Sequence, residues 1–188
     1  MNIRYNAPVS ITFALIALIV LAVDQLTKSA LISFLFTAPS RGSFEPTNVF
    51  SYLRLLLHVI GHADWTHFMS NFAFILLLGP GLEEKYGSWS ILFMVIITAL
   101  VTGLLNAVFL PTGLKGASGV VFMMILLTSF ANIRRGELPI TFILVVLIFL
   151  AKEVINAFRE NSISEFTHIV GGILGSLFGF FKPVKSKK

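Results

Sequence analysis

The sequence predicts an all-α membrane protein, a single domain of six transmembrane helices over residues 1–188. The 188 residues are 56% hydrophobic and only 12% charged, and the mean hydropathy is +0.89. This balance is far from that of soluble domains. A spanning helix needs about 20 apolar residues, so the chain has room for about six or seven spans joined by short turns.

The first apolar run extends from Ala7 to Val23. Asp24 and Lys28 follow it, and their i,i+4 spacing predicts an ion pair at the end of the helix. No small-residue cleavage pattern comes after the run, so we interpret it as a retained helix rather than a signal peptide. A long connection over about 28–64 comes next, with the turn-rich sequence APSRGSFEPTN. Connections of this length usually carry structure of their own, and we expect short helices in the membrane interface.

Five further spans follow, separated by the charged turns GLEEKYGS, PTGLKG, NIRRGE and RENSISE. Their predicted bounds are Thr66 to Leu78, Trp89 to Leu110, Ser118 to Ile133, Pro139 to Phe158 and Phe166 to Phe181. Six spans put both termini on one side. Lys and Arg favour that side by eight to six, and four of the eight lie in the basic tail 182–188. The positive-inside rule therefore predicts cytoplasmic termini, with Ser118 near the outer face.

Composition argues against several classes of site. The chain has no cysteine, which removes disulfides, thiolate metal sites and cysteine nucleophiles. The net charge of +5 is explained by the tail as a cytoplasmic flank, so we expect no nucleic-acid partner. His58, His62 and His67 lie close together, but Val59 stands where a zincin needs glutamate after the first histidine. We therefore expect no metal site.

Polar side chains at membrane depth are costly, about 2.5 to 3.5 kcal/mol for a charge, and they commonly mark functional sites. His67 and Asn71 are four residues apart at the start of the second span and share a helix face. His168 opens the sixth span, one turn before Gly171, Gly175 and Gly179, which repeat every four residues. Such a glycine stripe favours close helix packing.

The sequence GASG at the start of the fourth span contains Ser118 between Gly116 and Gly119. A small-residue cluster of this kind is by itself usually a packing surface. Ser118, His168 and the polar pair His67 and Asn71, however, stand at similar depth on three helices. They supply a nucleophile, a base and anion-stabilising donors. No Asp or Glu accompanies Ser118 or His168 in its span, so a Ser-His dyad is a simpler hypothesis than a triad.

These residues and motifs resemble the rhomboid family of intramembrane serine proteases in its compact six-helix form. The resemblance covers nearly all of the chain after the first span. It rests on HADWTHFMSN, GPGLEEKYGS, GASG and HIVGGILG, in this order. It implies a six-transmembrane-helix bundle of the rhomboid type. The implied activity is hydrolysis of peptide bonds in or next to transmembrane helices of membrane-protein substrates, without a cofactor.

The resemblance also implies roles for single residues. Ser118 would be the nucleophile and His168 the general base and later the general acid. Asn71, His67 and the Ser118 backbone amide would form the oxyanion hole. Structural positions near the site would be Gly116, Gly119, Phe122, Gly171 and Gly175.

Further positions take structural interpretations. His58 and His62 would support the long connection, and Glu83 would tie the turn between the second and third spans. The family carries an aromatic-arginine pair where this chain has Leu53 and Arg54. It also commonly carries a tyrosine against the catalytic histidine where this chain has Phe122. The ring is kept there and the hydroxyl is lost.

Two alternatives stay open. A catalytically inactive rhomboid-like binder of membrane proteins would keep the fold without needing Ser118. A small transporter would carry its charges deeper, along several helices. On the protease interpretation the partners are transmembrane substrates and the lipid bilayer, and the location is a prokaryotic plasma membrane. The fifth span and RENSISE would be the mobile parts that admit substrate.

Overall fold

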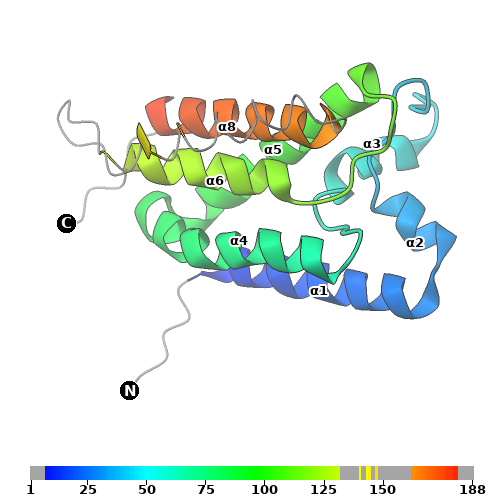
Figure 1. Ribbon diagram of the computed structural model, residues 1–188, viewed down its shortest axis with the longest axis horizontal. Coiled ribbons are helices and arrows are strands. Elements are labelled where there is room, and N and C mark those ends of the chain that lie inside the picture. Colours follow the sequence, from blue (N-terminus) through cyan, green and yellow to red (C-terminus); the bar gives the residue numbers. More distant parts are fainter. Residues whose placement is uncertain (1–6, 132–139, 141–142, 145–146, 148–161, 182–188) are drawn as a thin grey trace.

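The computed structural model describes residues 7–131, 140, 143–144, 147 and 162–181, which form an all-α bundle (Figure 1). The described residues contain seven helices with defined bounds, labelled as in Figure 1. These are α1 (Pro8–Thr27), α2 (Ala30–Leu35), α3 (Val49–Leu57), α4 (Trp65–Tyr86), α5 (Ser88–Phe109), α6 (Ser118–Ala131) and α8 (Ser162–Phe181).

Among the described helices, α1 and α5 are each long and apolar enough to cross a membrane. The apolar helical stretches Ser118–Phe130 and Phe166–Phe181 are shorter. The predicted third span, Trp89 to Leu110, coincides with α5 to within one residue at each end. Most of the predicted span from Pro139 to Phe158 lies outside the described residues. The number of six spans therefore stays a prediction.

Two predicted boundaries are wrong. α4 continues past Leu78 and through Pro80 to Tyr86, so most of the predicted turn GLEEKYGS is helical. Buried contacts of Glu83 and Tyr86 stabilise these last turns, and Gly87 ends them with φ of 84°. α8 begins at Ser162, four residues before the predicted start, so the end of RENSISE is helical as well.

The long connection contains α2 and α3, which confirms the prediction of short helices. Each begins with a side-chain cap: the Ser29 hydroxyl accepts a hydrogen bond from the Ile32 amide, and the Asn48 side chain accepts one from the Phe50 amide. Arg54 of α3 is buried. Its Nε donates to the Thr37 carbonyl at 2.8 Å, and its guanidinium lies 4.0 Å from the centre of the Phe34 ring. The aromatic partner of Arg54 is therefore a residue of α2, not its neighbour in the chain.

Two predicted polar contacts are wrong. The Glu83 carboxylate does not bind the turn after α4. It accepts hydrogen bonds from the Val9 and Ser10 amides, at 3.1 and 2.8 Å, and from the Ser10 hydroxyl at 2.7 Å, so it caps α1. The Lys28 ammonium group does not pair with the Asp24 carboxylate, because Lys28 ends α1 in the left-handed conformation, with φ of 50°. Its Nζ donates to Gln25 Oε1 at 2.9 Å instead.

α6 lies inside the bundle, where it packs against α8, α4 and α5 (Figure 1). The core around it is apolar and includes Phe72, Ile75, Met94, Met123 and Leu127, each at most 2% exposed. This placement brings the first turn of α6 next to the beginnings of both α4 and α8, where the predicted polar residues stand.

Candidate active site

Ser118 is the first residue of α6 and is half-buried. The Val121 amide donates to the Ala117 carbonyl at 3.0 Å and closes the first turn of the helix. The amides of the residues before Val121 have no carbonyl one turn back to bind. Together with the helix dipole they give the surroundings of Ser118 a partial positive charge. This favours an anion beside the serine.

Backbone contacts fix the residues directly before Ser118. The Gly116 amide donates to the His58 carbonyl at 2.9 Å, and the Ala117 amide donates to His62 Nε2 at 3.4 Å. Gly116 has φ of +131°, and a Cβ there would lie 2.6 Å from Cε1 of His67. Only glycine meets both conditions without strain. The predicted structural roles of His58 and His62 agree with these contacts.

Both of these histidines are neutral at physiological pH. His62 Nδ1 lies 3.1 Å from the Ile60 carbonyl, which can only accept, so Nδ1 carries the proton and Nε2 accepts from the Ala117 amide. Burial lowers the pKa of His62 to about 4, with further lowering by His67 and Lys115. Burial also lowers the pKa of His58 to about 4. His58 lies between the Leu55 carbonyl, at 3.0 Å from Nδ1, and the Thr102 hydroxyl, at 3.3 Å from Nε2.

α4 carries His67 and Asn71 toward this region. Asp64 caps the helix by accepting a hydrogen bond from the His67 amide at 2.8 Å. The His67 ring lies over Gly116 and makes an edge contact with the His62 ring, 5.0 Å between centroids. Asn71, one turn further, is 6% exposed. Its side-chain nitrogen has no hydrogen-bond partner within the described part of the chain. Buried polar groups nearly always have a hydrogen-bond partner, so an unpaired one calls for an explanation. This nitrogen can donate to an oxygen of a bound molecule.

α8 presents His168 to α6. His168 is buried, and its ring lies against the Phe122 ring with centroids 4.2 Å apart and planes inclined by 34°. Phe122 is one turn after Ser118 on the same helix. The predicted packing of Phe122 on this histidine is therefore observed. Residues four apart share a helix face, so His168 lies against the face of α6 that carries Ser118 and Phe122.

The glycine stripe of α8 makes this close approach possible. A Cβ on Gly171 would collide with the Gly119 carbonyl, whose carbon would be 2.8 Å away. A Cβ on Gly175 would meet the Met123 backbone, and one on Gly179 the Phe130 ring. On the α6 side, a Cβ on Gly119 would lie 3.0 Å from Thr167 Cγ2. The two backbones are in contact at Gly171 and Gly175, as the four-residue repeat predicts.

Gly116 and Gly119 thus flank Ser118 in the chain, and Phe122 follows it one turn later on α6. His67 of α4 contacts Gly116, and His168 of α8 contacts Phe122. Within the described ranges, no group of three or more His, Asp or Glu side chains is arranged to hold a metal ion.

Sequence reasoning assigned no role to Lys115 or Thr102. Lys115 Nζ lies 3.1 Å from Asp24 Oδ2, and the Thr102 hydroxyl contacts His58 as described. The one signal available for Lys115 was a charge directly before GASG. Thr102 is one of several polar residues of α5, with Thr98 and Asn106 among them, and its spacing gives no sign of a partner.

Comparison with known proteins identifies relatives of the chain. Residues 49–183 match the family described as the Rhomboid domain. The chain is 25% identical over 130 residues to a protein described as rhomboid protease GlpG of Haemophilus influenzae, an alignment that covers 68% of each protein. The family consists of integral membrane helical bundles, in agreement with the apolar helices α1 and α5.

Proposed function

We propose that the chain, which belongs to the rhomboid family, is an intramembrane serine protease with Ser118 as nucleophile and His168 as general base. It cleaves peptide bonds in or next to transmembrane helices of membrane-protein substrates. The observation that carries this proposal is the contact between the N-terminal part of α6 and the His168 turn of α8, where the Phe122 and His168 rings lie 4.2 Å apart. The rhomboid protease relative supports the same reaction class.

The chemistry is acyl transfer in two stages. His168 accepts the proton of the Ser118 hydroxyl as its oxygen attacks the substrate carbonyl carbon, and the imidazolium then protonates the departing amine. The C–N bond breaks and leaves an ester on Ser118. Water, with its proton taken by His168, hydrolyses that ester and frees the serine. The reaction consumes one water and needs no cofactor.

The oxyanion formed at the carbonyl needs donors. The Ser118 amide at the positive end of α6, the Asn71 side-chain nitrogen and His67 are our candidates. Asn71 has the strongest support, because its buried nitrogen is without a partner in the described residues. Removing one such donor typically costs about 2.7 to 4 kcal/mol of transition-state stabilisation.

The proposal includes the transmembrane arrangement predicted from charge. Six spans with cytoplasmic termini put Ser118 near the outer face, where water can reach it. A substrate helix has to unwind locally before its carbonyl can reach the serine, since an intact helix hides its backbone. The fifth span, our candidate for a mobile element that admits substrate, lies outside the described residues apart from single positions.

The experiment is cleavage of a model transmembrane substrate by the purified protein. Ser118→Ala and His168→Ala should each lower the cleavage rate by at least about 10³-fold. Ser129→Ala is the matched control, because Ser129 lies on the same helix and its hydroxyl donates to the Ile125 carbonyl. It should cleave normally. A folded wild-type protein that binds the substrate without cutting it would favour the inactive binder instead, and equal cleavage by Ser118→Ala would contradict the dyad.

A further inference from the structure

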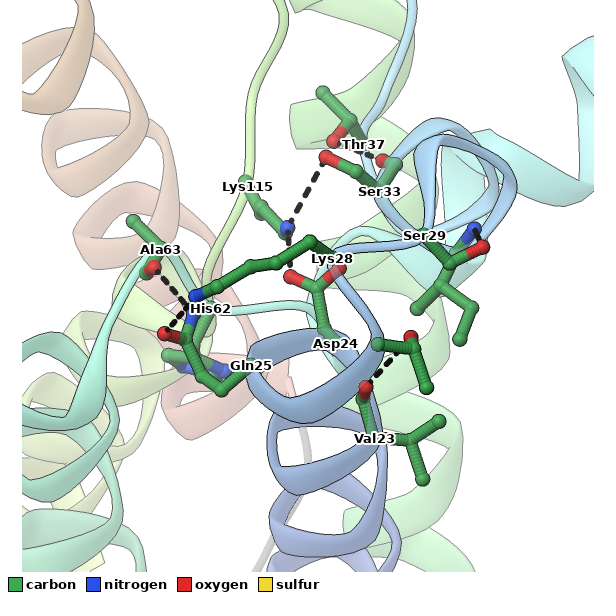
Figure 2. Close-up of polar contacts among 12 residues, drawn as sticks. Val23, Asp24, Gln25, Lys28, Ser29, Ser33, Thr37, His62, Ala63 and Lys115 are labelled. Carbon is green, nitrogen blue, oxygen red and sulfur yellow. Dashed lines mark hydrogen bonds and ion pairs between the residues drawn. The ribbon is translucent and has the colours of Figure 1, made fainter.

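A half-buried ion pair joins α1 to the loop that leads to Ser118. Lys115 Nζ lies 3.1 Å from Asp24 Oδ2, and the two side chains are only 16% and 12% exposed. Figure 2 shows the ammonium group between Asp24 and the Ser33 hydroxyl, which is 3.5 Å from Nζ. Since the pair is largely shielded from solvent, it is weakly screened by salt, and removing one partner leaves the other charge uncompensated.

The four residues before Ser118 are all tied to other segments of the chain. The Leu114 carbonyl accepts from the Ala38 amide at 2.8 Å, and the amides of Gly116 and Ala117 donate to His58 and His62. These ties are made by the loop backbone, whereas Lys115 is tied through its side chain. Its stem crosses Gly61, where a Cβ would lie 3.1 Å from the lysine Cε. The ion pair of Lys115 with Asp24 therefore adds a charged side-chain contact to the backbone hydrogen bonds that hold this loop.

The same end of α1 also binds the segment before α4. Gln25, next to Asp24, donates from Nε2 to the Ala63 carbonyl at 3.2 Å (Figure 2). Ala63 stands between His62, which binds the Ala117 amide, and Asp64, which caps the helix carrying His67. The end of α1 thus contacts both the loop of the nucleophile and the start of the helix that carries the candidate oxyanion donors.

We propose that the Asp24–Lys115 ion pair is a positioning pair for catalysis, which sets Ser118 relative to the start of α4. This inference rests on the proposed protease function. Neither residue touches the reacting atoms, so the effect is on geometry. A displacement of about 1 Å in an active site can lower the rate about 10²-fold. In addition, the charge of Lys115 disfavours protonation of His62, which keeps Nε2 able to accept from the Ala117 amide.

The experiment measures kcat, KM and the rate of fluorophosphonate labelling below the unfolding temperature of each variant. Lys115→Met and Asp24→Asn should each lower kcat and the labelling rate about 10-fold to 100-fold, with KM within about threefold of wild type. Lys115→Arg, which keeps the charge, should recover most of the rate. Arg41→Met is the matched control, because Arg41 is an exposed cation in the connection that follows α1, and it should behave as wild type.

A merely stabilising pair gives a different result. The variants would then unfold at lower temperature but keep wild-type kcat and labelling rate while folded, and this would overturn the inference. Asp24→Asn keeps the side-chain volume and carries the test if Lys115→Met does not fold. A wild-type protein that neither labels nor cleaves would contradict the proposed function and the inference together. If the wild-type protein is active and the Asp24 and Lys115 variants keep its kcat and labelling rate, only the inference about the ion pair is contradicted.

Discussion

The two members of the proposed dyad are positioned in different ways. Ser118 follows an irregular loop whose residues are tied by hydrogen bonds and one ion pair to α1, His58 and His62. His168 belongs to a regular helix that packs backbone to backbone on α6 through glycines. The nucleophile thus depends on charge and protonation state, whereas the base depends on side-chain volume. Substitutions and pH can therefore disturb one without the other.

The largest effect should come from adding volume at the α6–α8 contact. In Gly171→Ala the new Cβ meets the Gly119 carbonyl group, and backbone atoms cannot move aside as a flexible side chain can. The helices have to separate, which typically costs about 1 to 3 kcal/mol and moves His168 away from Ser118. We expect a lower unfolding temperature and a cleavage rate reduced at least about 100-fold.

Gly81→Ala is the matched control for this substitution. Gly81 is also a helical glycine, and a Cβ there has nothing within 4 Å. It should leave cleavage unchanged and stabilise the protein by about 0.5 to 1 kcal/mol, because alanine restricts the unfolded chain more than glycine does. If both alanine variants kept wild-type cleavage, the requirement for close packing would be wrong.

Acid should lower the stability of the protein, because His58 and His62 are buried in their neutral form beside the loop that leads to Ser118. His58 and His62 have folded-state pKa values lowered from 6.5 to about 4 by burial, so between these values the unfolded chain binds more protons. Stability is therefore at its full value above pH 6.5 and falls as the pH drops toward 4, by on the order of 3 kcal/mol for each histidine. Thermal unfolding between pH 7.5 and 4.5 measures this loss.

His62→Gln separates the two contributions. It removes one titrating group, so the loss of stability between pH 6.5 and 4.5 should fall by about half relative to wild type. An unchanged acid dependence in this variant would show that His62 does not titrate as its burial implies. Labelling of Ser118 at pH 7.5 should stay near the wild-type rate, because the glutamine Oε1 replaces Nε2 as acceptor of the Ala117 amide.

A smaller effect is expected at Phe122, whose ring contacts His168. Phe122→Ala removes the contact and should lower kcat about 10-fold by loosening the imidazole. Phe122→Tyr keeps the ring, and we expect kcat within about threefold of wild type. Steady-state cleavage by both variants measures the difference between ring and hydroxyl. Equal kcat for the alanine and tyrosine variants would contradict a role of the ring in positioning.

The smallest effect on cleavage should come from Glu83, which is outside both positioning systems. Glu83→Gln weakens three hydrogen bonds to the first turn of α1, and bonds to charged groups contribute about 1.5 to 3 kcal/mol each. The variant should unfold at a lower temperature while its cleavage rate, measured well below that temperature, matches wild type. A large loss of rate without loss of stability would link this cap to the site.

The features that could be predicted from the sequence are local patterns. The repeat of Gly171, Gly175 and Gly179 indicated a packed face, and the structure shows that face on α6. The bounds of α5 followed from uninterrupted hydropathy. The ring of Phe122 was placed on His168 through the family resemblance, one turn after the serine, and the structure shows that contact.

The failures concern contacts between distant parts of the chain. Spacing paired Asp24 with Lys28, but the helix ends at Lys28 in a left-handed conformation and Asp24 binds Lys115, 91 positions away. α4 extends beyond Pro80 because Glu83 binds the start of α1. No local pattern contains these partners, since they depend on how the helices pack.

The proposed dyad makes Ser118 a nucleophile that His168 activates. Its most direct test is to treat the folded protein with a fluorophosphonate and locate the adduct by peptide mass spectrometry. We predict a single adduct on Ser118, formed at the wild-type rate in Ser129→Ala and at least about 100-fold more slowly in His168→Ala. An unlabelled folded protein, an adduct on another residue, or labelling unaffected by His168→Ala would contradict the claim.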